Sequence, residues 1–170
     1  MLPIYKEEVI CYILTVMEKQ PILIIVRGLP GSGKSTFAEK IVKAIPDSAH
    51  FESDSFFMRG GEYVWKPELA FVAHRICEKK TAKSLDQRKV TVVSNTFTRE
   101  SELNNYFAMA EAKNAKVIVF RMENSFPNVH GVPDETLEKM KLRFIDVEGE
   151  RKVFASTSDA EIENLKKELA

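Results

Sequence analysis

The 170-residue sequence contains little cysteine and no excess of either charge. Its two cysteines, Cys11 and Cys77, are too few for a disulfide framework and lack the spacing of a metal site. Lysine and arginine together number 25, as do aspartate and glutamate, so the formal net charge is zero. Because no global positive field attracts a polyanion, a nucleic-acid substrate would need a local basic patch.

Long hydrophobic runs are also missing. The longest nearly apolar stretch, Val9–Met17, is about half the length that a membrane-spanning helix requires. The acidic residues Glu7 and Glu8 precede it, whereas a secretory signal begins with positive charge. We therefore expect a cytoplasmic protein of a reducing compartment, with no membrane partner.

The rest of the chain alternates predicted strands with predicted helices. Apolar runs predict strands at Ile22–Arg27, His50–Ser53, Val90–Ser94, Lys116–Phe120 and Val153–Ala155. Apolar periodicity and end signals predict helices at residues 5–19, between the glycine loop and Pro46, and around Leu103–Ala110. Further helices are predicted to begin at Pro67, at Pro133 and at a capping box over Ser158–Glu161. The helix from Pro67 carries several apolar residues on one face, which are Leu69, Val72, Ala73, Ile76 and Cys77.

This alternation predicts an α/β fold with three layers, in which helices cover both faces of a central parallel sheet of four or five strands. We expect a single domain over residues 1–170. In it, residues 1–20 form an added N-terminal helix and residues 156–170 a C-terminal helix.

The sequence GLPGSGKST at residues 28–36 fits the phosphate-binding P-loop pattern between a strand and a helix. Its glycines let backbone N–H groups converge on phosphate oxygens, Lys34 supplies a cation, and the Ser35 hydroxyl ligates Mg²⁺. The predicted nucleotide-binding residues are Gly28, Pro30, Gly31, Ser32, Gly33, Lys34, Ser35 and Thr36.

One carboxylate follows the second predicted strand, at the edge where ligands of parallel sheets bind. Asp54, in ESDSFF, is placed there to accept the proton of an attacking hydroxyl during phosphoryl transfer. After the third strand, many P-loop enzymes carry an acid that holds the water shell of magnesium, but this chain has the uncharged Ser94 and Asn95. We therefore predict that Asp54 also serves the metal.

The chain resembles the polynucleotide-kinase-like P-loop kinases in the order of its short motifs, which are GLPGSGKST, SD, SNT, VHGVP and LEKMKLRF. The resemblance covers roughly residues 22–146. It implies a kinase that uses ATP or GTP with Mg²⁺ and acts on a nucleic-acid or nucleotide hydroxyl. Asp54 matches the general base of that family, and Lys34, Ser35 and Thr36 match its phosphate and magnesium ligands. It also implies that the first and third strands are neighbours.

The chain departs from this family in two places. Where members carry an aspartate after the third strand, this chain has Ser94-Asn95-Thr96-Phe97. The family's arginine-bearing lid is reduced to RMENSFPN, in which Arg121 is the single arginine, and Arg143 in the next helix is the other candidate. By resemblance, Arg121 and Arg143 would stabilise charge on the moving phosphoryl group.

Several alternatives are open at this stage. An aromatic cluster forms either a stacking wall for a base or a satellite core under a long loop. The cluster consists of Phe56, Phe57, Tyr63 and Trp65, and it is interleaved with Arg59 and Lys66. His74 points into the acceptor groove or packs on its helix, and His130 is read as a turn residue. The alternative functions are a kinase for a small metabolite or for a hydroxylated base in DNA, and a regulatory module that binds a nucleotide with little catalysis.

Overall fold

The computed structural model describes residues 20–87, 90–127 and 131–170. Within these residues a parallel sheet of five strands has the order β2-β5-β1-β6-β7. The strands are β1 Ile22–Arg27, β2 Ala49–Phe51, β5 Val90–Ser94, β6 Lys116–Met122 and β7 Arg151–Val153. The predicted parallel sheet is confirmed, and so is the pairing of the first predicted strand with the third, β1 with β5.

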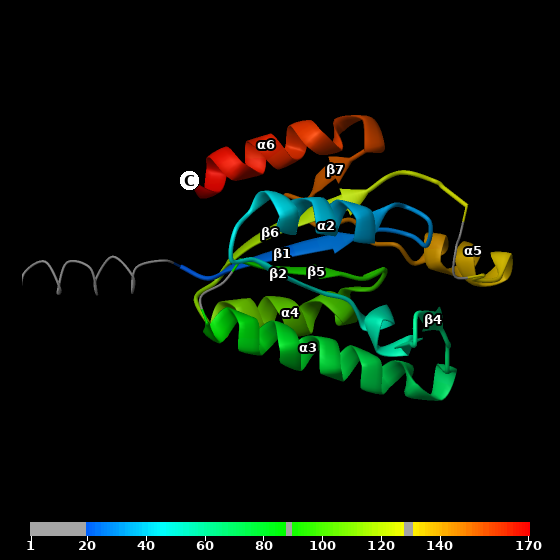
Figure 1. Cartoon of the computed structure of the whole chain (residues 1–170). Coiled ribbons are helices and arrows are strands. Elements are labelled where there is room, and N and C mark those ends of the chain that lie inside the picture. The colour runs from blue at the N-terminus through cyan, green and yellow to red at the C-terminus, as the bar shows by residue number, and fades with distance from the viewer. Residues whose placement is uncertain (1–19, 88–89, 128–130) are drawn as a thin grey trace, which may run out of the picture.

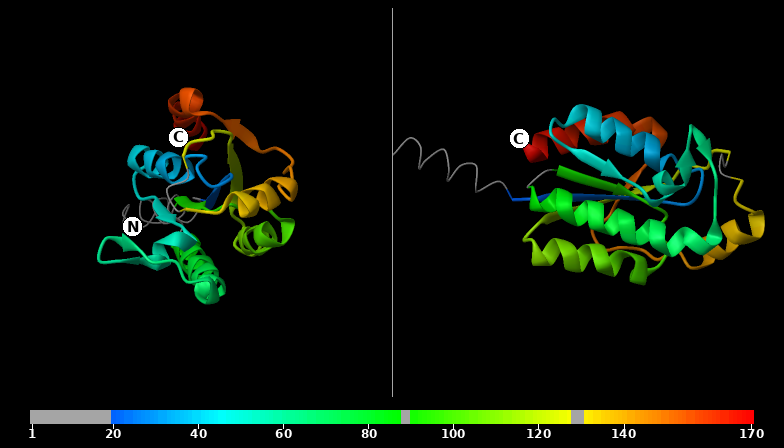
Figure 2. Two further views of the ribbon diagram at one scale, coloured as in Figure 1. Left: turned by 90° about the vertical axis from the view of Figure 1, so that its right-hand side faces the viewer. Right: turned by 60° about the horizontal axis from the view of Figure 1, so that its bottom comes forward.

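Helices cover both faces of the sheet (Figure 1). The α-helices are α2 Lys34–Ala44, α3 Ala70–Asp86, α4 Glu100–Ala112, α5 Asp134–Leu142 and α6 Ser158–Leu169. Helices α2 and α6 lie on one face, and α3 and α4 lie on the other. Helix α5 stands beyond the carboxyl ends of the strands, toward the viewer in the left view of Figure 2.

The period of two in β1 explains why the sheet has a core on each side. Ile24 and Val26 point to one face, and Leu23 and Ile25 point to the other, all fully buried. The first pair packs against side chains of α2 and α6, which are Phe37, Ala38, Ile41, Ile162 and Leu165. The second pair packs against side chains of α3 and α4, which are Cys77, Leu85, Leu103, Tyr106 and Ala110.

The apolar face predicted for α3 is only partly buried, and the cap predicted for α6 is wrong. Val72 is 41% exposed, whereas Ala73 and Cys77 on the same helix are buried. Ser158 does not cap α6: the preceding residues form a 3-10 helix, so Ser158 is already helical and its hydroxyl donates to the Ala155 carbonyl.

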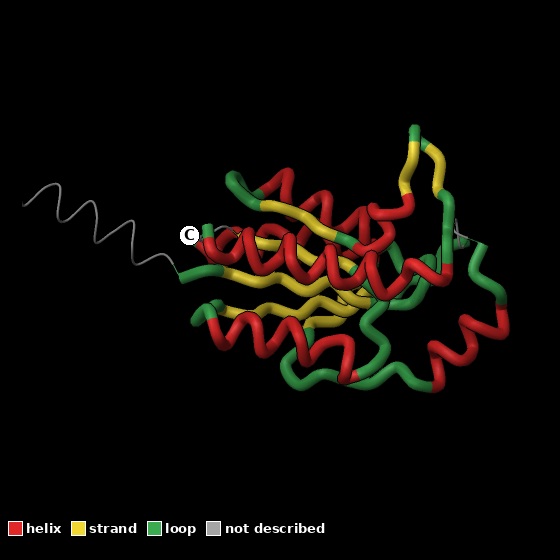
Figure 3. The backbone as a smooth tube through the Cα atoms, turned by 90° about the horizontal axis from the view of Figure 1, so that it is seen from below, coloured by secondary structure: helices red, strands yellow, loops and turns green. Residues whose placement is uncertain are grey.

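A short hairpin follows the edge strand β2 and projects from the sheet (Figure 3). Strands β3 Met58–Arg59 and β4 Glu62–Tyr63 pair antiparallel across Gly60 and Gly61. Both glycines have positive φ, 57° and 88°, which is what a two-residue hairpin turn of this kind requires. The hairpin turns the following aromatic residues back toward the carboxyl ends of the strands.

The predicted helix at 5–19 lies outside the described residues, as do Cys11 and His130. Among the helices that the structure describes, none is long and apolar enough to cross a membrane.

Candidate functional site

The glycine loop joins β1 to α2 and adopts a conformation that only glycine tolerates easily. Gly31 and Gly33 have φ of 78° and 87°, and Gly33 caps the amino end of α2. A Cβ atom on Gly31 would lie 2.3 Å from the Phe126 carbonyl oxygen. The loop also contains a buried hydroxyl, Ser32 Oγ, for which the described residues offer no hydrogen-bond partner. An unsatisfied donor and amide groups at a helix start fit a bound phosphate.

Lys34, the first residue of α2, directs its side chain back over this loop. Its Nζ donates a hydrogen bond of 2.8 Å to the Leu29 carbonyl. Burial lowers the pKa of Lys34 to about 8, while the negative charges of Asp54 and Glu52 act in the opposite direction. The ammonium is therefore still protonated at neutral pH but poorly solvated, and an anion placed beside it would restore the missing interaction.

Glu52, which is not among the site residues predicted from the sequence, contacts Ser35, the predicted magnesium ligand. The Ser35 hydroxyl donates to Glu52 Oε2 at 2.8 Å, and the Ser94 hydroxyl donates to the same oxygen at 3.1 Å. His50 Nε2 lies 2.7 Å from Ser94 Oγ. Because a hydroxyl has one proton and Ser94 gives it to Glu52, we assign His50 as the donor to Ser94.

The position of Glu52 follows from strand register. Phe51 of β2 is level with Val93 of β5, so Glu52 comes level with Ser94 at the carboxyl ends of two adjacent strands. The sequence did contain the signal, since Glu52 directly precedes the predicted Ser53-Asp54 pair. The contact between Glu52 and Ser94 could not be predicted from the local sequence pattern, because it depends on which strands lie side by side and in what register.

Asp54 lies on a short 3-10 helix, Ser53–Phe57, that follows β2. Its Oδ1 accepts a hydrogen bond of 3.3 Å from the Tyr63 hydroxyl, which comes from the hairpin. Burial, with the charge of Asp54, raises the pKa of Tyr63 to about 12, so the phenol remains a donor at neutral pH. The hairpin thus orients the carboxylate that the sequence predicts as the base.

Asn95, one of the two uncharged residues after β5, holds the start of that 3-10 helix. Its side-chain oxygen accepts from the Ser53 backbone N–H at 2.9 Å. The Ser53 hydroxyl is in turn 3.0 Å from His74 Nδ1 of α3. Asn95 is buried, and its amide also lies 3.8 Å from Cys77 Sγ. Asn95 and His74 therefore help to position Asp54.

One cavity of about 550 Å³ joins these groups. The glycine loop, the ends of β2 and β5, the aromatic residues of the hairpin and α5 form its walls. The polar side chains that line it are Lys34, Ser35, Thr36, Glu52, Ser53, Asp54, His74, Ser94, Asn95, Thr96 and Thr136. Phe57, Tyr63 and Trp65 form its aromatic wall. Phe57 is buried while Trp65 is 48% exposed, so the cluster is both a small core and an open ring surface.

Arg121 is outside this cavity. Its guanidinium pairs with Glu123 at 2.7 Å and with Glu150 at 3.2 Å, contacts Asp146, and lies 4.7 Å from the centre of the Phe144 ring. Three carboxylates thus already surround this cation. Its predicted catalytic role stays a prediction.

Arg143, at the end of α5, is also outside the cavity lining. Its Nε donates to the Thr98 hydroxyl at 2.9 Å, which ties the end of α5 to the segment after β5. The phosphoryl-stabilising role predicted for Arg143 likewise stays a prediction. Lys34 is the cation that the structure places on the cavity beside Asp54 and Glu52.

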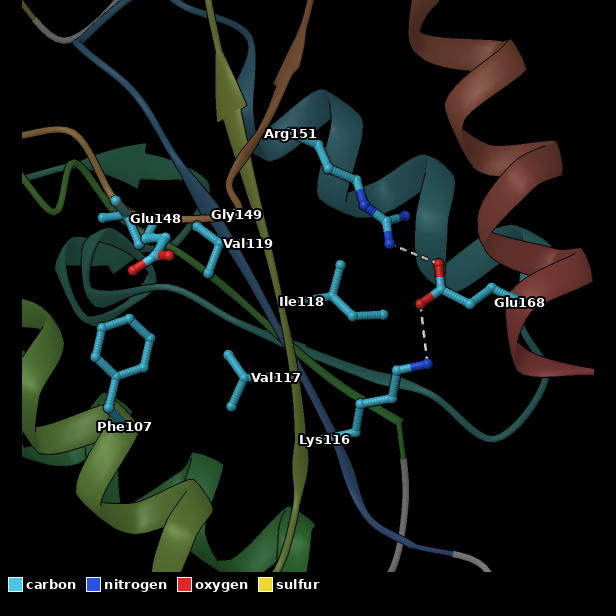
Figure 4. Close-up of a pocket in the computed structure, with 10 residues that line it drawn as sticks. Phe107, Lys116, Val117, Ile118, Val119, Glu148, Gly149, Arg151 and Glu168 are labelled. Carbon is cyan, nitrogen blue, oxygen red and sulfur yellow. Dashed lines mark hydrogen bonds and ion pairs between the residues drawn. The ribbon is translucent and has the colours of Figure 1, made fainter.

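Figure 4 shows a second hollow, of about 310 Å³, beside β6. Phe107 and Val117 line it, and on another side Glu168 of α6 pairs with both Lys116 and Arg151, at 2.9 and 2.7 Å. It shares no lining residue with the first cavity. Its two cations already share one carboxylate, so we assign the chemistry to the first cavity.

Comparison with known proteins places the chain in a family. A family model described as an AAA domain matches residues 23–126. The uncharacterized protein PM0531 of Pasteurella multocida (strain Pm70) is 32% identical over 137 residues, which span 73% of this chain and 76% of that protein. NEDD4-binding protein 2 of Homo sapiens is 28% identical over 131 residues, or 70% of this chain, but the match spans 7% of the human protein.

Solved structures show the same fold. A gluconokinase from Sinorhizobium meliloti 1021 has a TM-score of 0.60 at 18% identity, covering 88% of this chain and 95% of that one. The Pnkp1/Rnl/Hen1 RNA repair complex contains a chain with a TM-score of 0.53 at 20% identity, covering 87% of this chain and 45% of that one. The fold is P-loop kinase-like.

Proposed function

The chain belongs to the AAA domain family, and from that premise we propose that it is a P-loop kinase. It transfers the γ-phosphoryl group of ATP or GTP to a hydroxyl of a polynucleotide 5′ end or of a nucleotide. The observation that carries the proposal is that Lys34 and Asp54 open on one cavity with the glycine loop. A cation for the phosphates and a carboxylate for the acceptor are the two groups that such a transfer needs.

In the proposed reaction, backbone N–H groups of the glycine loop and the Lys34 ammonium bind the β- and γ-phosphates. The acceptor oxygen attacks the γ-phosphorus as its proton passes to the Asp54 carboxylate, and the bond from the γ-phosphorus to the β–γ bridging oxygen breaks. The Tyr63 hydroxyl keeps Asp54 turned toward the acceptor. Bound Mg²⁺ would neutralise charge on the phosphates, and the Ser35 hydroxyl is the proposed ligand in the loop.

The aromatic wall supports a nucleotide or polynucleotide acceptor. Trp65 and Tyr63 offer ring faces at the cavity, and a base stacked on such a face gains about 1–3 kcal/mol. Arg59 lies in the hairpin and Lys66 follows it, so both carry positive charge near this wall, although neither lines the cavity. The fold likeness to a chain of an RNA repair complex agrees with this acceptor class.

A small-metabolite kinase is the second candidate, because the likeness to gluconokinase extends over nearly the whole of both chains. One acceptor screen separates the candidates. The purified protein is incubated with labelled ATP or GTP and a DNA oligonucleotide, an RNA oligonucleotide, nucleoside 3′-monophosphates, or gluconate. Label transfer to the oligonucleotides or monophosphates supports the proposal, and transfer to gluconate alone replaces it. Tight nucleotide binding without transfer to any acceptor favours the regulatory module.

Asp54→Asn tests the base. If Asp54 accepts the acceptor proton, we expect the transfer rate to fall by about 10²–10⁴ while nucleotide affinity is retained, because an amide accepts no proton. A rise in the magnesium concentration for half-maximal rate would add the metal role predicted from the sequence. Asparagine suits turns about as well as aspartate, so a rate and magnesium dependence equal to those of the parent would reduce Asp54 to a turn residue.

Arg121→Ala and Arg143→Ala test the two arginines. An arginine that stabilises the moving phosphoryl group contributes on the order of 10³–10⁵ in rate. If either arginine acts in this way, we expect its alanine variant to lose rate far more than nucleotide affinity in a single-turnover assay. Unchanged turnover in both variants would instead leave Arg121 to its ion pairs and Arg143 to its bond with Thr98.

A further inference from the structure

The carboxylate missing after β5 has a counterpart on the neighbouring strand. Ser94 occupies the end of β5, where an acid would hold magnesium, and its side chain cannot supply the charge. Glu52 of the adjacent strand end is level with it, and its Oε2 accepts the Ser94 hydroxyl proton at 3.1 Å. A negative charge is thus present at this edge of the sheet, one strand further out.

The contact with Ser35 connects Glu52 to the metal. A serine that ligates a cation through an oxygen lone pair must give its proton to another acceptor. The acceptor in the structure is Glu52 Oε2, 2.8 Å from Ser35 Oγ. A carboxylate there suits Mg²⁺ in two ways, since it orients the serine lone pair toward the loop and contributes charge that this cation prefers.

Asp54 is held differently. The hydrogen bond that the structure records for its carboxylate comes from Tyr63, on the hairpin side of the cavity. Glu52 instead faces the glycine loop, and its side chain is 25% exposed, so it is accessible from the cavity. The two neighbouring carboxylates therefore have different hydrogen-bond partners, Tyr63 of the hairpin for Asp54 and Ser35 of the glycine loop for Glu52, while the charges of both act on Lys34.

We propose that Glu52 is the acidic residue of the magnesium site, supplied from β2 in place of an acid at the end of β5. This inference rests on the proposed kinase function and divides the two tasks that the sequence assigned to Asp54. Glu52 serves the metal, together with Ser35, and Asp54 serves the acceptor hydroxyl. Ser94 and His50 form a hydrogen-bonded chain that fixes the Glu52 side chain.

The test measures binding and needs no turnover. The affinity of the nonhydrolysable β,γ-imido analogues of ATP and GTP is titrated against Mg²⁺ for the parent, Glu52→Gln and Asp54→Asn. Glutamine keeps the size of the side chain and an oxygen that accepts hydrogen bonds, but it carries no charge. We expect Glu52→Gln to raise the magnesium concentration for half-maximal binding by about 10–100-fold. We expect Asp54→Asn to leave that concentration close to the parent value.

A double variant, Glu52→Ser with Ser94→Asp, moves the carboxylate back to β5. We expect it to recover a magnesium dependence within a few-fold of the parent, because the charge returns to the same edge beside Ser35. A merely structural Glu52 would show a lower melting temperature in Glu52→Gln, with the magnesium dependence unchanged in both this variant and the double variant. That result overturns the inference and leaves the kinase proposal intact. If the parent itself binds neither analogue in a magnesium-dependent way, both proposals fail together.

Discussion

Lys34→Ala is expected to abolish phosphoryl transfer and to weaken nucleoside triphosphate binding strongly, while the protein remains folded. The variant removes the cation that the structure places on the cavity beside the glycine loop. Charge-assisted contacts to phosphate are among the strongest hydrogen bonds in proteins, so their loss affects both binding and rate. The measurements are label transfer to the best acceptor and calorimetric titration with the β,γ-imido analogue.

Stability gives a control on this variant. Because burial lowers the pKa of Lys34 to about 8 from 10.5, the unfolded chain binds more protons than the folded chain between these pH values. The free energy of unfolding of the parent should therefore rise relative to Lys34→Ala from about pH 8 upward, and the difference should be flat below that pH. Lys43→Ala, an exposed lysine of the same helix, should retain transfer. Undiminished transfer in a folded Lys34→Ala variant would contradict the phosphate-binding role proposed for Lys34.

Arg27→Met is expected to cause the largest loss of stability, about 3–5 kcal/mol in the free energy of unfolding. Arg27 is completely buried at the end of β1, and its Nη1 pairs with Glu150 at 2.8 Å. Its Nη2 donates to the Phe97 and Ile145 carbonyls, each at 2.8 Å, and the guanidinium lies 4.3 Å from the centre of the Phe144 ring. Methionine fills some of the volume, but the buried Glu150 carboxylate and the two carbonyls lose the hydrogen bonds that Arg27 donates.

Urea unfolding of the variant, followed by circular dichroism, measures this loss. Arg75→Met is the matched control, because Arg75 is half exposed and pairs with Glu78 within one helix turn of α3. We expect that control to cost at most about 1 kcal/mol. Equal losses in the two variants would mean that Arg27 is not the central tie between the end of β1 and the segments that follow β5 and α5.

Arg27 also shows how stability and the site are linked. Phe97, whose carbonyl accepts from both Nε and Nη2 of Arg27, has a left-handed φ of 45°, which is unusual for a phenylalanine. Phe97 follows Ser94, Asn95 and Thr96, which line the cavity. The buried arginine therefore holds this backbone in a conformation that returns the chain from the cavity to α4.

The sequence by itself determined the features that depend on neighbouring residues. The buried strand at Ile22–Arg27, the glycine loop after it and the helix from Lys34 are each recognised within a few residues, because backbone conformation there depends on local glycine and apolar pattern. Alternation of strands and helices likewise determined the parallel sheet and its two covered faces. The same alternation placed Asp54 after the second strand, at the carboxyl ends of the strands, where the cavity lies.

Only the tertiary structure decided which side chains meet. Glu52 and Ser94 are 42 positions apart, and their contact depends on β2 lying beside β5 with Phe51 level with Val93. Arg27 reaches Glu150 across 123 positions, and Arg121 turns to carboxylates outside the cavity although its sequence context resembles a lid. These contacts follow from strand order and register, which arise when the whole core packs, and the local apolar pattern does not determine which side chains they bring together.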